Sequence, residues 1–73
     1  MKISLPHPYE WRFDHANGQN SAILIYTKEG GVIARKALNS DNPMKEGYEF
    51  LEKANIQELA NEAKTWNGVI FIP

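Results

Sequence analysis

The chain has 73 residues, a net charge of −1, 42% hydrophobic residues, two tryptophans, three tyrosines and three phenylalanines. These values predict one small folded domain and exclude an intrinsically disordered chain, because that much apolar surface supports a core. The absence of cysteine excludes a disulfide framework and a thiolate zinc site, so buried apolar side chains must supply the stability. The near-neutral charge argues against a nucleic-acid binder of the usual basic kind.

The first residues carry no targeting pattern. Met1-Lys2 is followed by only three residues before Pro6, too few for the apolar region of a signal peptide. No run approaches the ~20 apolar residues that a membrane-spanning helix needs. We therefore expect a cytoplasmic protein with no membrane segment, and a short strand over residues 2–5 that Pro6 and Pro8 end.

Residues 9–15 predict the first long strand. Tyr9, Trp11 and Phe13 alternate with charged residues, which is the period-two pattern of a strand with one apolar face. The following Asn17-Gly18 predicts a tight turn, because both residues tolerate positive φ.

Two more strands continue an antiparallel meander. Residues 21–27 are apolar on both faces, which predicts a central position in the sheet. A Glu-Gly-Gly turn at 29–31 leads into a third strand over 32–38. Because this strand carries Arg35 and Lys36, we expect one end of it to lie near solvent or at an edge.

Residues 43–66 carry a helical pattern. Pro43 suits a first helical turn, and Asn55 is a good N-cap in the middle of the region. The pattern therefore favours two helices, with one bent helix as the alternative. Gly47 predicts either a point of close packing or a weak spot in the first helix. The two apolar stripes comprise Met44, Tyr48, Leu51 and Ala54, then Ile56, Leu59, Ala60, Ala63 and Trp66.

The last strand is apolar throughout. Asn67-Gly68 supplies a stop for the second helix, and residues 69–72 follow without a polar side chain. A strand that is apolar on both faces needs neighbours, so we expect it in the interior of the sheet. The pattern leaves its pairing direction open.

The order β-β-β-α-α-β predicts a small two-layer α+β domain over residues 1–73. An antiparallel meander of residues 9–38 and the strand 69–72 would form the sheet, and the helices of 43–66 would pack on one face of it. The predicted core comprises Trp11, Phe13, Ile23, Leu24, Ile25, Ile33, Tyr48, Leu51, Ile56, Leu59, Ala63, Trp66, Ile70 and Phe71.

Catalytic and metal-binding patterns are lacking in the sequence. No serine or threonine stands in a nucleophile motif, and His7 and His15 match no zinc spacing. The glycines at 30–31 precede a strand rather than a helix, unlike a phosphate-binding loop. We therefore predict a non-enzymatic protein without a cofactor or a metal ion.

Five glutamates fall outside the apolar stripes and predict an acidic helical face. The simpler interpretation is a solvated surface that keeps the domain soluble. The functional interpretation is the docking surface of a protein-interaction module or small inhibitor, whose protein partner is basic. These residues are Glu46, Glu49, Glu52, Glu58 and Glu62.

The aromatic strand offers an alternative function, the binding of single-stranded nucleic acid. Exposed rings would stack on unpaired bases beside nearby cations. The competing interpretation makes the rings the core face beneath the helices, and it is favoured because so small a chain cannot spare three rings. The residues of this alternative are Tyr9, Trp11, Arg12, Phe13, Arg35 and Lys36.

Homodimerisation is a further expectation, left open by the sequence. The third strand or residues 1–5 would leave an edge of the sheet exposed. A second copy would close that edge and support a marginal core.

Overall fold

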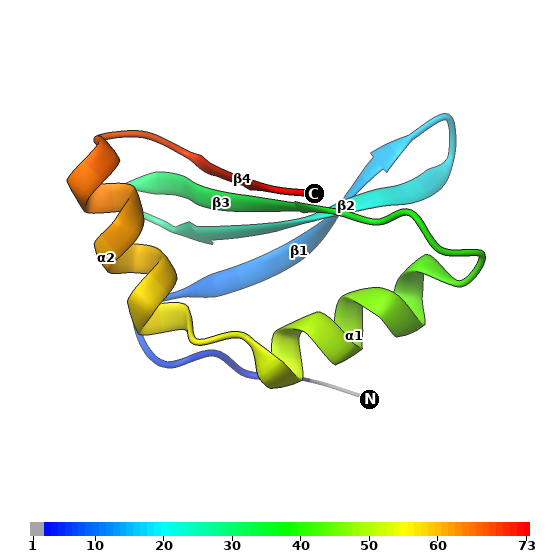
Figure 1. Cartoon of the computed structure of the whole chain (residues 1–73), viewed down its shortest axis with the longest axis horizontal. Helices are drawn as coiled ribbons and strands as arrows, with labels where there is room; N and C mark the ends of the chain where they lie inside the picture. The colour runs from blue at the N-terminus through cyan, green and yellow to red at the C-terminus, as the bar shows by residue number, and fades with distance from the viewer. Residues whose placement is uncertain (1–2) are drawn as a thin grey trace.

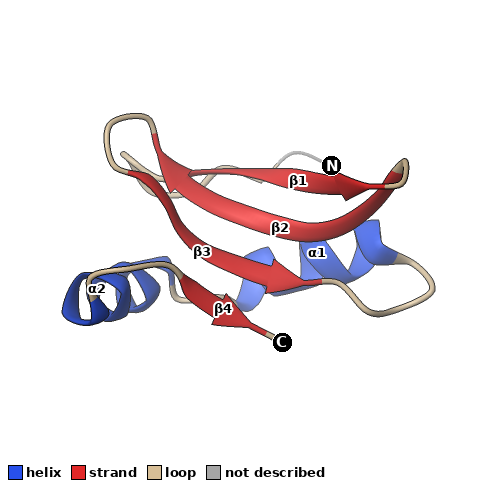
Figure 2. Cartoon of the chain, turned by 90° about the horizontal axis from the view of Figure 1, so that it is seen from above, coloured by secondary structure: helices blue, strands red, loops and turns tan. Residues whose placement is uncertain are grey.

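The computed structural model describes residues 3–73 and shows a two-layer α+β domain. One four-stranded sheet has the strand order β1-β2-β3-β4, and both helices lie on the same face of it (Figure 1, Figure 2). The predicted fold class and element order are confirmed. The elements are β1 (Glu10–Ala16), β2 (Gln19–Thr27), β3 (Gly31–Ala37), α1 (Pro43–Lys53), α2 (Ile56–Trp66) and β4 (Ile70–Ile72). No helix within residues 3–73 has the length and apolar character needed to cross a membrane.

The first three strands form the predicted antiparallel meander. Asn17 and Gly18 turn the chain between β1 and β2 at φ values of 55° and 75°, the left-handed region that this pair tolerates. In the register, Trp11 lies opposite Ile25 and Phe13 opposite Ile23. Side chains alternate along a strand, so these four lie on the face that the helices cover.

The helical region contains two helices, each with its own cap. Asn42 accepts a hydrogen bond from the Lys45 amide at the start of α1, and Asn55 accepts one from the Glu58 amide at 3.1 Å at the start of α2. These side chains satisfy amides that a helix end leaves unpaired. The helix prediction is therefore resolved as two helices, with the break at residues 54–55.

The aromatic strand packs beneath α1. Trp11, Phe13 and Tyr48 make edge-to-face contacts with ring centroids 5.3–5.9 Å apart, a favourable aromatic geometry. These rings border a core that includes the fully buried Ile23 and Ile25. The core interpretation of the aromatic strand is thus confirmed.

β4 occupies an edge of the sheet, so its predicted interior position is wrong. It pairs parallel with β3, opposite residues 34–36. The chain leaves β3, passes through both helices and returns in the same direction, which is a crossover connection. Because β2 already occupies one side of β3, β4 pairs on the other side. The third strand is therefore internal, so the expectation that it leaves an exposed edge is wrong, whereas its first residue, Gly31, is exposed to solvent.

Two predicted core residues are exposed. Trp66 is 73% exposed and Phe71 is 72% exposed. Phe71 lies opposite Arg35 in the register and therefore on the open face of the sheet, which we define as the face without helices. Trp66 has the spacing of the apolar stripe of α2, but it lies on a side of that stripe that the sheet does not cover. The other predicted core residues are buried or half-buried.

Residues 3–5 form no strand, contrary to the prediction. They pack against the core instead, and the Ile3 carbonyl accepts a hydrogen bond from the Trp11 indole at 2.8 Å. Residues 1 and 2, included in the predicted exposed edge, lie outside the described part of the chain.

Candidate functional site

Glu46 does not belong to an outward-facing acidic surface. Its carboxylate accepts hydrogen bonds from the Asn39 and Ser40 amides at 2.8 and 2.9 Å and pairs with the Lys36 ammonium at 3.4 Å. The Ser40 amide lowers the pKa of Glu46 most, partial burial opposes this change, and the Asn39 amide and Lys36 lower the pKa further. Glu46 therefore holds the loop between β3 and α1 and is not free for a partner.

The remaining four glutamates, at positions 49, 52, 58 and 62, are exposed. Glu58 and Glu62 line a groove of about 220 Å³ between α1 and α2. Phe50, Ala54 and Leu59 supply its apolar lining. We call the site formed by residues 50, 54, 55, 58, 59 and 62 the acidic groove. Glu49 and Glu52 do not line it.

Within residues 3–73, the carboxylates of Glu58 and Glu62 have no hydrogen-bond or ion-pair partner. They stand four residues apart on α2, where like charges repel slightly. Their charge is therefore available to a cation from outside the chain.

Trp66 is the last residue of α2, one helical turn beyond Glu62, and does not line the acidic groove. It follows Leu59 and Glu62 at spacings of seven and four residues, so the three side chains share one ridge of the helix. Its ring is mostly solvent-exposed. An exposed aromatic ring on the same ridge of α2 is apolar surface that a partner can cover.

Sequence reasoning missed two parts of this site. Phe50 falls outside the stripe assigned to α1, although it stands four residues before Ala54, a spacing that places both on one side of the helix. In the structure its ring centroid lies 5.9 Å from the Lys36 ammonium, and the ring lines the groove. Trp66 was assigned to the core.

The residues of the nucleic-acid alternative are not gathered on one surface. Trp11 and Phe13 lie under the helices, whereas Arg12 pairs with Leu24 on the open face. Arg35 shares that open face and lies 3.9 Å from the Asp14 carboxylate. Lys36, on the helix side, donates to backbone carbonyls as well as to Glu46. Trp11 and Phe13 thus lie on the opposite face of the sheet from both arginines, and Tyr9 lies before β1, where it lines a separate cleft.

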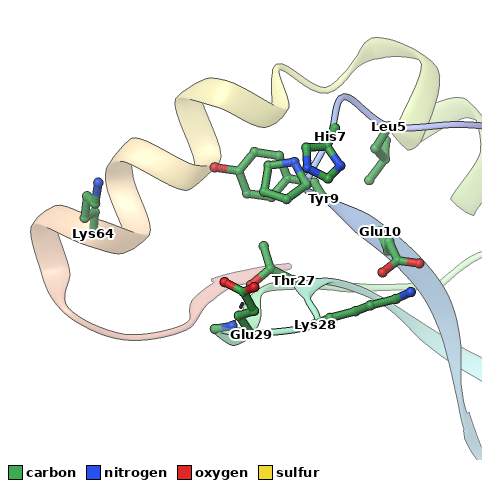
Figure 3. A pocket seen from close by; sticks show the side chains of 10 residues that line it. Leu5, His7, Tyr9, Glu10, Thr27, Lys28, Glu29 and Lys64 are labelled. Atoms are coloured by element: carbon green, nitrogen blue, oxygen red, sulfur yellow. Dashed lines mark hydrogen bonds between the residues drawn. The ribbon is translucent and has the colours of Figure 1, made fainter.

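A larger cleft of about 1080 Å³, more enclosed than the acidic groove, lies between the residues before β1, the β2–β3 turn and α2. Figure 3 shows the rings of His7 and Tyr9 on one side of this cleft and Lys64 on α2 at another. Charged side chains of both signs line it, Lys28 and Glu29 among them. These charged side chains lie at the surface, since no charged residue within 3–73 is buried.

Metal ligands are likewise not assembled. In the described part of the chain, no group of three histidine, aspartate or glutamate side chains is placed to hold a metal ion. Comparison of the chain with models of known protein families, with curated proteins and with solved structures finds no match in any of the three.

Proposed function

We propose that this protein is a non-enzymatic interaction module that binds a basic segment of a partner protein through the acidic groove. The observation that carries the proposal is the placement of two unpaired carboxylates, Glu58 and Glu62, beside an apolar lining. The lining can hold an apolar anchor side chain, and the carboxylates favour a cation next to it.

The size of the groove indicates a macromolecular ligand. Its volume of about 220 Å³ is below the ~300–1,000 Å³ of typical small-molecule pockets. It can accommodate one or two side chains rather than a whole small ligand. A basic amphipathic segment would place an apolar residue against Phe50 and Leu59 and a lysine or arginine beside the glutamates.

Trp66 would contribute to the same contact. Tryptophan is frequent among the residues that dominate binding energy, because a large ring loses much water-exposed surface at a small entropic cost. The nucleic-acid alternative has no comparable support, since Trp11 and Phe13 lie on the opposite face of the sheet from its two arginines.

The proposal is tested by charge reversal with a matched control. The variant Glu58→Lys/Glu62→Lys reverses the acidic groove, and Glu49→Lys/Glu52→Lys makes the same change of charge outside it. Proteins captured from the native host by each variant are quantified by mass spectrometry. We expect the groove variant to lose its principal partner, with affinity reduced about tenfold or more, while the control retains it.

Two results would contradict the proposal. Capture unchanged by the groove variant would show that the groove is not the docking surface. Equal loss of partner capture in both variants would show that only the overall charge matters. Circular dichroism checks beforehand that each variant is folded.

A further inference from the structure

The two edges of the sheet differ in how they are protected. β1 carries Glu10, Arg12 and Asp14 on the open face and has an irregularity in its register between Asp14 and His15. Charges and irregularities of this kind discourage pairing with another strand. Residues 69–73 at the other edge carry no charged side chain at all.

β4 and the residue before it also expose apolar side chains. Phe71 is 72% exposed and Val69 is 39% exposed. One side of the β4 backbone pairs with β3, and no strand within residues 3–73 pairs with its other side (Figure 2). An apolar strand with a free backbone edge is a template for another strand.

We infer that β4 pairs antiparallel with β4 of a second copy, so that the two sheets join into one continuous sheet across a two-fold axis. In a register centred on Phe71, this ring lies opposite the partner's Phe71 on the open face. Ile70 then lies opposite the partner's Ile72 on the helix side. Each of these cross-strand pairs is apolar, which is the pairing that stabilises a sheet.

A second copy fits this edge because a two-fold axis requires only one self-complementary patch. β4 is apolar on both faces, and an identical strand matches it on both faces at once. A foreign strand that carries the usual alternation of apolar and polar residues would set polar side chains against one of these faces.

The exposed area predicts a weak dimer. Phe71 and Val69 of two copies expose on the order of 400 Å² of apolar side-chain surface, whereas a stable complex buries about 1,200–2,000 Å² in total. The hydrogen bonds of the joined edges and the flanking residues add to this contact. We therefore expect a dissociation constant in the micromolar range and a mass that depends on concentration.

Sedimentation equilibrium tests this inference. From roughly 5 to 500 micromolar, a range that brackets such a dissociation constant, the wild-type mass should rise from monomer towards dimer. Phe71→Lys should stay monomeric, because it places a charge on each side of the two-fold axis. Met44→Lys is the matched control, since Met44 is also exposed, at 47%, but lies on α1, and it should behave as the wild type.

Disulfide trapping tests the register. The chain has no cysteine, so Phe71→Cys introduces a single thiol. Directly opposite residues of antiparallel strands lie ~4.5–5.5 Å apart at Cα, within the range of a disulfide. Phe71→Cys should form a covalent dimer under mild oxidation much faster than Met44→Cys does.

The inference fails if the wild type remains monomeric across the whole range of protein concentration. In that case the free edge of β4 would be a site for a strand of a different protein. It also fails if Phe71→Lys dimerises like the wild type, or if the two cysteine variants cross-link at equal rates. It does not depend on the acidic groove, and Glu58→Lys/Glu62→Lys should dimerise normally.

Discussion

Glu46 holds the start of α1 to the end of β3 through its contacts with two loop amides and Lys36. The Ser40 amide is the largest cause of the lowered pKa of this carboxyl group. A carboxyl whose pKa is lower in the folded than in the unfolded state stabilises the fold fully above its unfolded pKa. That stabilisation is lost as the pH falls through the folded pKa.

The change Glu46→Gln keeps the shape of the side chain and removes its charge. Near neutral pH we expect the free energy of unfolding to fall by about 1 kcal/mol, because the loop amides lose a charged acceptor. The difference from wild type should shrink as the pH falls through the lowered pKa. Urea unfolding at neutral and acid pH measures it, with the exposed Glu49→Gln as control. A loss of the same size at both pH values would contradict this account.

At the scale of elements, α1 packs tightly against the sheet at Gly47. A Cβ atom there would lie 2.9 Å from Phe13 Cε1 and 3.0 Å from Ile23 Cδ1. Both neighbours belong to the packed interior, where side chains have little room to move. Gly47 is therefore a point of close packing, which settles the alternative that the sequence left open.

The change Gly47→Ala should destabilise the protein although alanine is the better helix former. The gain in helix propensity is about 1 kcal/mol, whereas forcing a methyl group into a packed core costs about 1–3 kcal/mol. We expect a net loss of up to 2 kcal/mol, measured by urea unfolding. Gly68→Ala is the control, because a Cβ at Gly68 would lie 3.9 Å from its nearest neighbour. A more stable Gly47→Ala variant would show that the helix can shift away from the sheet.

The sequence predicted which segments form strands and helices better than it predicted which strands lie side by side in the sheet. Periodicity identified the meander and two helical stripes, because it reports which side of an element faces apolar surroundings. It does not report which strand covers another strand's edge, so β4 was placed inside the sheet. The same apolar pattern is what an edge that pairs with a second copy would show.

The candidate site was predicted in part, since Glu58 and Glu62 were expected to face outward and do so. The groove beside them was not predicted, because it depends on how α1 and α2 meet at residues 54–55. Trp66 was misplaced because spacing alone does not tell how much of a stripe the sheet covers. Glu46 was misplaced because its partners are loop amides, which no side-chain pattern encodes.

At the scale of the whole molecule, so small a domain has little apolar surface to bury within one chain. Large apolar side chains nevertheless remain exposed on it, among them Trp66 and Phe71. We assign Trp66 to the contact with a basic partner and Phe71 to the contact with a second copy. Each contact would cover apolar surface that the monomer leaves exposed. The variant Glu58→Lys/Glu62→Lys tests the first contact, and Phe71→Lys tests the second.

Dimerisation through β4 should make thermal stability depend on protein concentration. A partner that binds only the folded chain raises the free energy of unfolding, by about 2.7 kcal/mol when it is present at 100 times its dissociation constant. For a domain of this size, 1 kcal/mol shifts the melting temperature by about 4–8 °C. Circular-dichroism melts over a hundredfold range of concentration should therefore move upward by several degrees for the wild type and for Glu58→Lys/Glu62→Lys. The melts of Phe71→Lys should coincide at every concentration, and a wild-type melting temperature that is equally constant would mean that β4 does not join two folded chains.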